Sequence, residues 1–490
     1  MNVVRKPYET QYRFDSSPIA QVRLNLECRD ELIPLLAGLQ YIYTDNELRR
    51  QVVRLVANDI NKESRRDVGR PGMDDWQVVV LAAVRLGCNY DYDKLQDQVE
   101  NHCSLRGIMG ICDWDFNDGF GFRRIRDTLC LLTPDTISKL NEAIVVAGQK
   151  LHGDAASSIR ADSFVVETNI HYPTESSLIW DGVRKSMGIC TELASVMGID
   201  GWRQAKHLGR KIKNLNQSIS RISSSKSLKK KEALKSQYGN ILQRTKLLLE
   251  RAKTLVAAAK MEPSSSSAFL LGAELSHWIE LTEQVCSTAE RRVILGEQVP
   301  NCDKLFSLFE THTQLYRRGK AKTPNQFGRL VLVFEDKAGF ISHYNLMGRD
   351  ASDSGVVVEQ TEIAQRKHKG QISSASFDRG FHSLENEKEL GKLVSEVCVL
   401  PKSPAQYAEK VKSESISFRK ARRRHSGVES AIGALQSGNG LKRCRDRSEV
   451  GFDRYFGLAV LGRNIHTLGK LLIKAKNEKA AAAMSKREAA

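Results

Sequence analysis

Two kinds of sequence pattern alternate along this chain, and their order limits the folds that it can adopt. A β-rich run covers residues 157–168, the next begins at Phe327, and a long stretch with helical periodicity separates the two. Strand patterns repeat every two residues and helix patterns every 3.6, so the two kinds of stretch belong to different elements. The sequence therefore predicts a mixed α+β fold with a large helical insertion between the first and second strands.

The insertion is expected at roughly residues 186–310, and its core is a pair of heptad-like runs. Apolar residues recur every four and three positions, which predicts two helices that pair as an antiparallel coiled-coil hairpin. The basic stretch 223–231 lies between the runs and is expected at an exposed tip. The seam residues are Leu208, Ile212, Leu215, Ile219 and Ile222 in the first run, and Leu234, Tyr238, Ile241, Thr245, Leu248, Ala252 and Leu255 in the second.

The strand patterns after the insertion predict a hairpin followed by a strand-helix-strand unit. Residues 327–334 and 339–346 are β-rich, and a polar turn that contains Glu335 and Asp336 joins them. These two acids are therefore expected in the turn, away from any site. Two later β-rich runs, 372–378 and 394–401, flank a helical pattern.

The segment before the first strand is expected to be helical. Thr133 followed by Pro134 is one clear helix start, with Thr as the N-cap. Short helices joined by Gly and Asn turns suit a DNA-binding domain and a plain helical bundle equally, and both interpretations stay open. The expected organisation is a helical N-terminal DNA-binding or dimerisation domain at 1–152, a mixed core at 153–185 and 311–473, the insertion at 186–310, and a flexible tail at 474–490.

Three acidic residues stand in contexts that suit one shared site. Asp162 lies inside a strand pattern, where Asp is disfavoured, Asp378 ends a later strand, and Glu429 begins a helix. Ordinary alternatives are a water-facing strand acid, a strand-end turn acid, and a capping box formed by Ser426 and Glu429. Three convergent carboxylates can hold two divalent cations, and two cations can catalyse cleavage of a phosphodiester bond.

The net charge of +17 predicts attraction to a polyanion, although a merely soluble basic protein has the same property. Basic residues are dense on both sides of Glu429, which next to a metal site favours a phosphate-binding surface over a solvated helix face. The candidate DNA-contacting residues are Arg419, Lys420, Arg422, Arg423, Arg424, His425, Lys442, Arg443, Arg445 and Arg447.

The cysteine and apolar patterns bear on compartment. Ten cysteines are scattered without a CxxC pair, which indicates reduced cysteines in a cytosolic protein. The first fifteen residues lack the apolar core of a signal peptide. The longest apolar stretch, 78–84, is far below the ~20 residues that span a bilayer. A cytoplasmic protein without a membrane partner is expected.

Five segments, in this order, carry a resemblance to a known family. They are GRPGMDDWQVVVLAAVRLGCNYDYDKLQDQVENHCSLRGIMG, ADSFVVETNIHYPTESSLIWDGVRK, TPNQFGRLVLVFEDKAGFISHYNLM, SFDRGFHSLEN and RRRHSGVESAIGALQSGNGLKRCRDRS. On these segments, which span most of residues 65–470, the chain resembles bacterial insertion-sequence transposases of the DDE type, closest to the ISNCY group. Related families often have Tyr, Arg and Lys at set offsets around the Glu, whereas this chain has His425 and Gln436 four before and seven after Glu429.

The resemblance implies a ribonuclease H-like catalytic core in which Asp162, Asp378 and Glu429 are the catalytic and metal-binding triad. It also implies two Mg²⁺ or Mn²⁺ ions as cofactors, terminal inverted repeats and target DNA as substrates, and a homodimer or higher oligomer on DNA. The expected reaction is cleavage at the element ends and transfer of the 3′-OH strand into target DNA. Alternatives are a ribonuclease H-like nuclease without strand transfer, a non-catalytic DNA-binding regulator and a coiled-coil scaffold.

Overall fold

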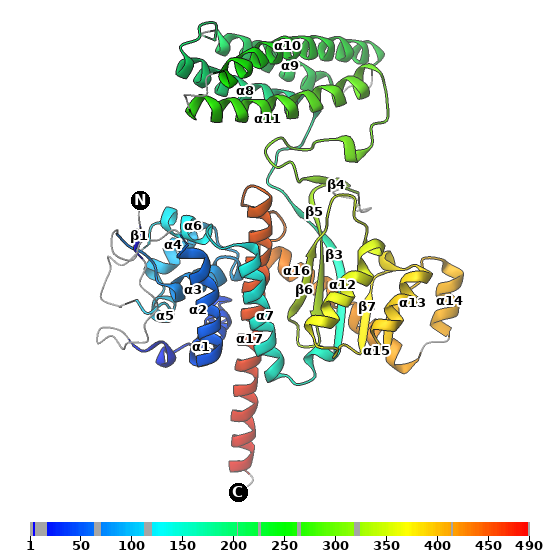
Figure 1. Ribbon diagram of the computed structural model, residues 1–490. Helices are drawn as coiled ribbons and strands as arrows, with labels where there is room; N and C mark the ends of the chain where they lie inside the picture. The colour runs from blue at the N-terminus through cyan, green and yellow to red at the C-terminus, as the bar shows by residue number, and fades with distance from the viewer. Residues whose placement is uncertain are drawn as a thin grey trace. The chain divides into compact units, whose positions relative to one another are not determined.

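The structure is a computed structural model that describes residues 3–4, 17–62, 70–111, 120–202, 204–223, 227–261, 266–317, 324–412 and 415–488. Contacts divide the chain into two compact units. Unit 1 consists of Met1–Asn169 with Arg329–Ala490, and unit 2 is Ile170–Gly328. Helices and a mixed sheet make up the described chain, so the expected mixed α+β class is confirmed (Figure 1).

The sheet contains the five predicted strands and, in the described chain, one further short strand, β4, that the sequence did not predict. Within the described chain its order is β4-β5-β3-β7-β8, and β6 pairs with β5. The β5–β6 hairpin is antiparallel, whereas β3, β7 and β8 run parallel to one another. The strands are β3 (Ser158–Glu167), β4 (Gln314–Tyr316), β5 (Gln326–Asp336), β6 (Ile341–Leu346), β7 (Ser374–Phe377) and β8 (Glu396–Val399). A short separate pair joins β1 (Val3–Val4) to β2 (Arg70–Pro71).

Helices cover both faces of the sheet in unit 1 (Figure 1). Side chains alternate between the faces of a strand, so Arg160 and Asp162 share one face of β3, and their neighbours Ile159 and Ala161 share the other. Helices α15 and α16 pack on the Asp162 face, and α12 and α13 lie on the opposite face. These helices are α12 (Asp353–Lys367), α13 (Leu384–Leu393), α14 (Pro404–Lys412), α15 (Ile416–His425) and α16 (Val428–Gly438).

The N-terminal helices share one hydrophobic core with the sheet and with α17 (Glu449–Glu488). Helices α1, α3 and α7 pack along α17, and Phe456 of α17 contacts Phe164 of β3 with ring centroids 6.5 Å apart. Pro134 is the first residue of α7 and Thr133 its N-cap, as predicted. The N-terminal helices are α1 (Leu32–Thr44), α2 (Asn46–Ile60), α3 (Asp75–Gly87), α4 (Tyr92–Asn101), α5 (Cys103–Ile108), α6 (Phe122–Leu129) and α7 (Pro134–Leu151).

Unit 2 contains a four-helix bundle, so the expected two-helix hairpin is only part of a larger module. The α9–α10 pair has most of the predicted seam, because Ile212, Ile241 and Leu255 are buried, whereas Leu215 and Leu234 are only partly buried. This pair also packs against α8, and α10 packs against α11, which buries a core common to all four helices. The helices are α8 (Glu175–Met197), α9 (Ala205–Ser223), α10 (Leu228–Lys260) and α11 (Ser266–Ala289). The middle of the expected tip, 224–226, lies outside the described residues.

The contact-based units do not coincide with the expected domain boundaries. The helical insertion begins at Glu175 rather than near 186, and the expected tail continues α17 as an exposed helix. Whether residues 1–152 act as a DNA-binding or dimerisation domain stays a prediction.

Candidate active site

Asp162 and Asp378 occupy equivalent positions on two neighbouring parallel strands. The last paired residues of β3 and β7 are Ala161 and Phe377; Asp162 comes next within β3, and Asp378 directly follows the end of β7. Asp378 keeps an extended backbone, with φ −71° and ψ 166°, so the alternation of side chains continues through it. The sheet therefore directs the two carboxylates to the same face, at the carboxyl ends of the paired segments.

Glu429 lies in the first turn of α16, on the helix that packs against β3. The capping-box alternative for this residue is wrong. The N-cap of α16 is Gly427, which makes no side-chain cap bond, and Ser426 instead ends α15, where its Oγ donates to the carbonyl of Arg423. The Glu429 side chain is exposed.

His425 interacts electrostatically with two of the three acids, Asp378 and Glu429. It ends α15, and its Nδ1 lies 3.3 Å from Ser376 Oγ on β7. Burial lowers the pKa of His425, while the charges of Asp378 and Glu429 favour its protonated form. The charge of one imidazole therefore depends on an acid that follows β7 and on an acid in α16.

Arg160 and Glu335 form an ion pair next to Asp162 that the sequence did not suggest. Arg160 Nε donates to Glu335 Oε2 over 2.5 Å, and Arg160 NH1 donates to the carbonyl of Arg424 over 2.7 Å. The prediction that Glu335 and Asp336 lie in the hairpin turn is wrong, because both are buried at the end of β5. The strand extends two residues further than expected, and Glu335 within this extension pairs with Arg160.

Gly427 matters for the same junction because a side chain there has no room. An added Cβ would lie 2.2 Å from Arg160 NH1. The close approach of this turn to β3 brings Arg160 directly under the start of α16 and thus beside Glu429. The sequence could have identified Arg160, because it is a second charged residue two positions before Asp162 and therefore on the same face of the strand.

The predicted basic residues separate into two groups. The exposed ones are Arg419, Lys420, Arg423, Lys442, Arg443, Arg445 and Arg447, and the half-buried ones are Arg422, Arg424 and His425. Arg424 is held inside the fold, since its NH1 donates to Ser158 Oγ over 2.5 Å and burial lowers its pKa. Arg443 lies 3.3 Å from Glu167. Arg443 is therefore exposed but already paired with a carboxylate, so exposure by itself does not identify a phosphate-binding residue.

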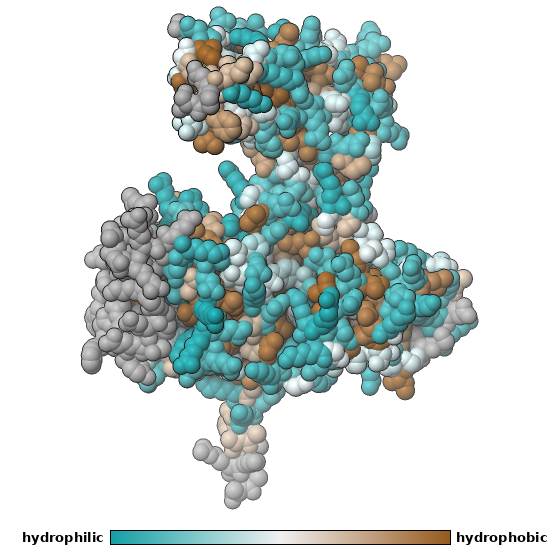
Figure 2. All heavy atoms as spheres, in the orientation of Figure 1, coloured by the Kyte–Doolittle hydropathy of each residue, from teal (hydrophilic) through white to brown (hydrophobic). Residues whose placement is uncertain are grey.

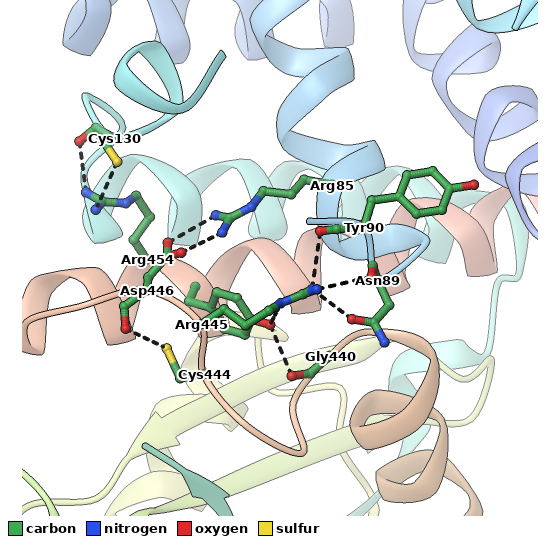
Figure 3. A network of polar contacts seen from close by, with 10 residues as sticks. Arg85, Asn89, Tyr90, Cys130, Gly440, Cys444, Arg445, Asp446 and Arg454 are labelled. Atoms are coloured by element: carbon green, nitrogen blue, oxygen red, sulfur yellow. Dashed lines mark hydrogen bonds and ion pairs between the residues drawn. The ribbon is translucent and has the colours of Figure 1, made fainter. Parts of the chain in front are cut away.

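Arg445 connects the loop between α16 and α17 to the end of α3 by hydrogen bonds (Figure 3). Its guanidinium donates to Asn89 Oδ1 over 2.8 Å, to the carbonyl of Tyr90 over 3.2 Å, and to Tyr455 Oη over 3.0 Å. The next residue, Asp446, pairs with buried Arg85 at 2.5 Å. These contacts hold the loop rigidly, and Lys442 and Arg447 remain exposed on it.

The donor chemistry of the site suits a hard divalent cation, but the side chains are not closely gathered. Carboxylate oxygens are the ligands that Mg²⁺ and Mn²⁺ prefer, and Asp162 and Asp378 supply them from adjacent strand positions. Across the described ranges, however, no three His, Cys, Asp or Glu side chains lie close enough together to hold a metal ion. The backbone brings the expected triad to one face of the fold without forming a closed ligand cage.

Comparison with family models, with curated proteins and with solved structures found no match for this chain. None of the helices in the described part of the chain is long and apolar enough to cross a membrane.

Proposed function

We propose that this chain is a DNA transposase of the DDE type, with Asp162, Asp378 and Glu429 as its catalytic acids. The observation that carries the proposal is the equivalent position of Asp162 and Asp378 on β3 and β7, with Glu429 on the helix that packs against β3. The three acids come from elements that are far apart in the chain. Proximity in sequence therefore does not explain why they lie on the same face. The mixed sheet is compatible with a ribonuclease H-like core.

The acidic and basic residues of the candidate site would have different roles. Asp162, Asp378 and Glu429 would hold two divalent cations, which when bound activate water and stabilise the leaving oxygen of a phosphodiester. Arg160 and Glu335 would keep β3 and β5 in place beside Asp162. The exposed side chains of Lys420, Arg423, Lys442 and Arg447 would contact the DNA backbone. Such contacts would position DNA without reading its sequence.

The test is cleavage of a duplex made from the DNA that flanks the coding sequence, in Mg²⁺ or Mn²⁺. The wild-type protein should nick the duplex to leave a 3′-OH and should join that end to a second duplex. Asp378→Asn keeps the size of the side chain and removes its charge, so it should abolish both steps. Glu362→Gln on α12 removes an exposed acid on the opposite face and serves as the matched control, with activity unchanged.

The outcomes separate the alternatives. Cleavage without joining would favour a nuclease that lacks strand transfer. Specific binding with no cleavage under any metal condition would favour a DNA-binding regulator. If the Asp378→Asn variant cleaves at the wild-type rate, Asp378 is not a catalytic acid. The proposal would then lose the relationship between Asp162 and Asp378 on which it rests.

A further inference from the structure

The positive charge of the chain is concentrated in one part of the insertion. Residues 204–260 contain fifteen Lys and Arg and only two acidic residues, a surplus of thirteen against +17 for the whole chain. This segment forms helices α9 and α10. The segment around Glu429, residues 419–447, has a smaller surplus of seven, from nine Lys and Arg against two acidic residues. The larger cationic surplus therefore lies in the four-helix bundle of unit 2.

Helix α9 carries a straight row of cations. Lys206, Arg210, Lys213 and Arg221 follow at helical spacing with Gln217 between the last two, so the five side chains lie along one side of the helix. All five are exposed, and the helix contains no acidic residue. At 1.5 Å per residue the row is roughly 22 Å long. We refer to these five residues as the α9 row.

One acidic helix of the bundle, α11, does not pack against α9. Helix α11 has three Glu and no Lys or Arg, and two of these acids are already paired: Glu274 with Lys185 at 2.9 Å, and Glu283 with Lys253 at 2.7 Å. Helices α9 and α11 both pack against α8 and α10, on opposite sides of that pair. The cations of the α9 row make no ion pairs within the described chain, so their mutual repulsion is unrelieved.

Such segregation differs from an ordinary solvated helix. Exposed helices usually intersperse acids and bases at i,i+4 spacing, where each pair contributes a few tenths of a kcal/mol. Four unpaired cations on one side of a helix forgo that stabilisation. The arrangement is explained if a polyanion supplies the missing negative charge.

We propose that the α9 row is a second DNA-binding surface, which contacts the phosphate backbone of a duplex. The choice of DNA as the polyanion rests on the proposed function, whereas the surface itself does not. A duplex carries one negative charge per ~1.7 Å of axis, so a row of this length faces about a dozen phosphates. Gln217 adds an amide donor of the kind that also binds phosphate oxygens.

The surface chemistry favours DNA over a membrane or an apolar protein partner. A helix that inserts at a lipid interface presents large apolar side chains beside its cations. In the described chain, none of the large hydrophobic residues that are exposed lies on α9. Hydrophilic residues also dominate the bundle surface in the view of Figure 2. The binding is therefore expected to be electrostatic and independent of sequence.

The test compares two full-length variants that each lose four positive charges. One changes Lys206, Arg210, Lys213 and Arg221 to Gln. The other, the control, changes four exposed lysines in the last part of α17 to Gln: Lys470, Lys474, Lys476 and Lys479. Affinity for a duplex of arbitrary sequence is measured from about 50 to 200 mM salt, where each phosphate contact contributes about 0.9 to the slope of log K against log salt. Thermal melting checks that both variants fold.

The α9 variant should bind more weakly and should have a slope shallower by roughly two to four, whereas the control should change the slope by less than about one. Equal losses in the two variants would reduce the effect to net charge and overturn the proposal. An unchanged slope in the α9 variant would overturn it, as would row-dependent binding to phosphatidylserine vesicles without binding to the duplex. Cleavage by Asp378→Asn, or its absence in the wild type, tests the catalytic proposal separately, since this assay needs no cleavage.

Discussion

Arg160 on β3 and Glu335 on β5 form a buried ion pair whose Nε–Oε2 distance is 2.5 Å. The Glu335 side chain is only 4% exposed and that of Arg160 is 18% exposed. Arg160 also bonds the carbonyl of Arg424, so a single guanidinium ties two strands to the turn that precedes Glu429. The framework of the candidate site therefore depends on a contact between residues 175 positions apart in the chain.

Glu335→Gln should destabilise the protein by about 2–3 kcal/mol. The substitution keeps the size of the side chain, but it leaves the Arg160 charge without its counter-ion in a largely buried place. Chemical denaturation measures the change. The Arg160→Gln, Glu335→Gln double variant should be less destabilised than the sum of the two single variants, because no lone charge remains. Strict additivity would mean that the two residues do not interact.

Glu429→Gln should abolish metal-dependent DNA cleavage while leaving DNA affinity largely intact. Gln is nearly isosteric and lacks the charge that a cation requires. Since the N-cap of α16 makes no side-chain bond, the helix should not lose stability in this variant. A cleavage assay paired with a gel-shift assay measures both properties. Cleavage at the wild-type rate would end the catalytic assignment of this residue.

Arg445→Ala should mainly reduce protein stability, whereas Arg447→Ala should mainly reduce DNA binding. Arg445 is engaged with Asn89, Tyr90 and Tyr455, so its loss should cost about 1–2 kcal/mol of stability, a figure reduced for its exposure. Arg447 is exposed, so its loss should change stability by less than about 0.5 kcal/mol and should weaken DNA binding equally across sequences. Thermal melting and a binding titration distinguish the two variants. A loss of stability in Arg447→Ala would assign it a structural role instead.

The stability of the Asp336→Asn variant, measured relative to the wild type, should be greater at neutral pH than at acidic pH. Burial raises the pKa of Asp336 to about 6, although Gln149 and the backbone N–H groups of Phe340 and Ala338 donate to its carboxylate. A raised pKa contributes stability below the unfolded value near 3.8, and this contribution is lost as the pH rises through 6. Asn does not titrate, so the variant avoids this loss of up to about 3 kcal/mol.

The measurement for Asp336→Asn is the difference in unfolding free energy between variant and wild type at several pH values from 4 to 8. Burial lowers the pKa of His343 and of His368 to about 4, so both proteins lose stability as the pH falls below 6.5. That loss is common to the two proteins and cancels in the difference. A difference that stays constant across the range would show that Asp336 has the same pKa in the folded and unfolded states.

Local patterns were sufficient for the elements themselves. The β-rich run around Asp162, the hairpin that begins near Phe327 and the helix start at Thr133 appear in the structure as predicted, because periodicity and capping depend on neighbours in the chain. The heptad seam likewise predicted that Ile212 and Ile241 are buried. The acids Asp162, Asp378 and Glu429 were selected from their contexts and their order in the chain, together with the family resemblance.

Tertiary structure decided which distant residues meet. The parallel register of β3 and β7 ends at the pair Ala161 and Phe377, so Asp162 and Asp378 each follow the last paired residue of their segment. No local pattern specifies the pairing of segments 216 residues apart. Burial of Glu335 depends on Arg160 reaching it from another strand, so the local pattern wrongly assigned Glu335 to a turn. The four-helix bundle arises because α8 and α11 bury apolar faces that two helices alone would leave exposed. Sequence by itself determined the secondary structure and the candidate acids, whereas strand register and long-range burial, which depend on contacts between distant residues, required the folded chain.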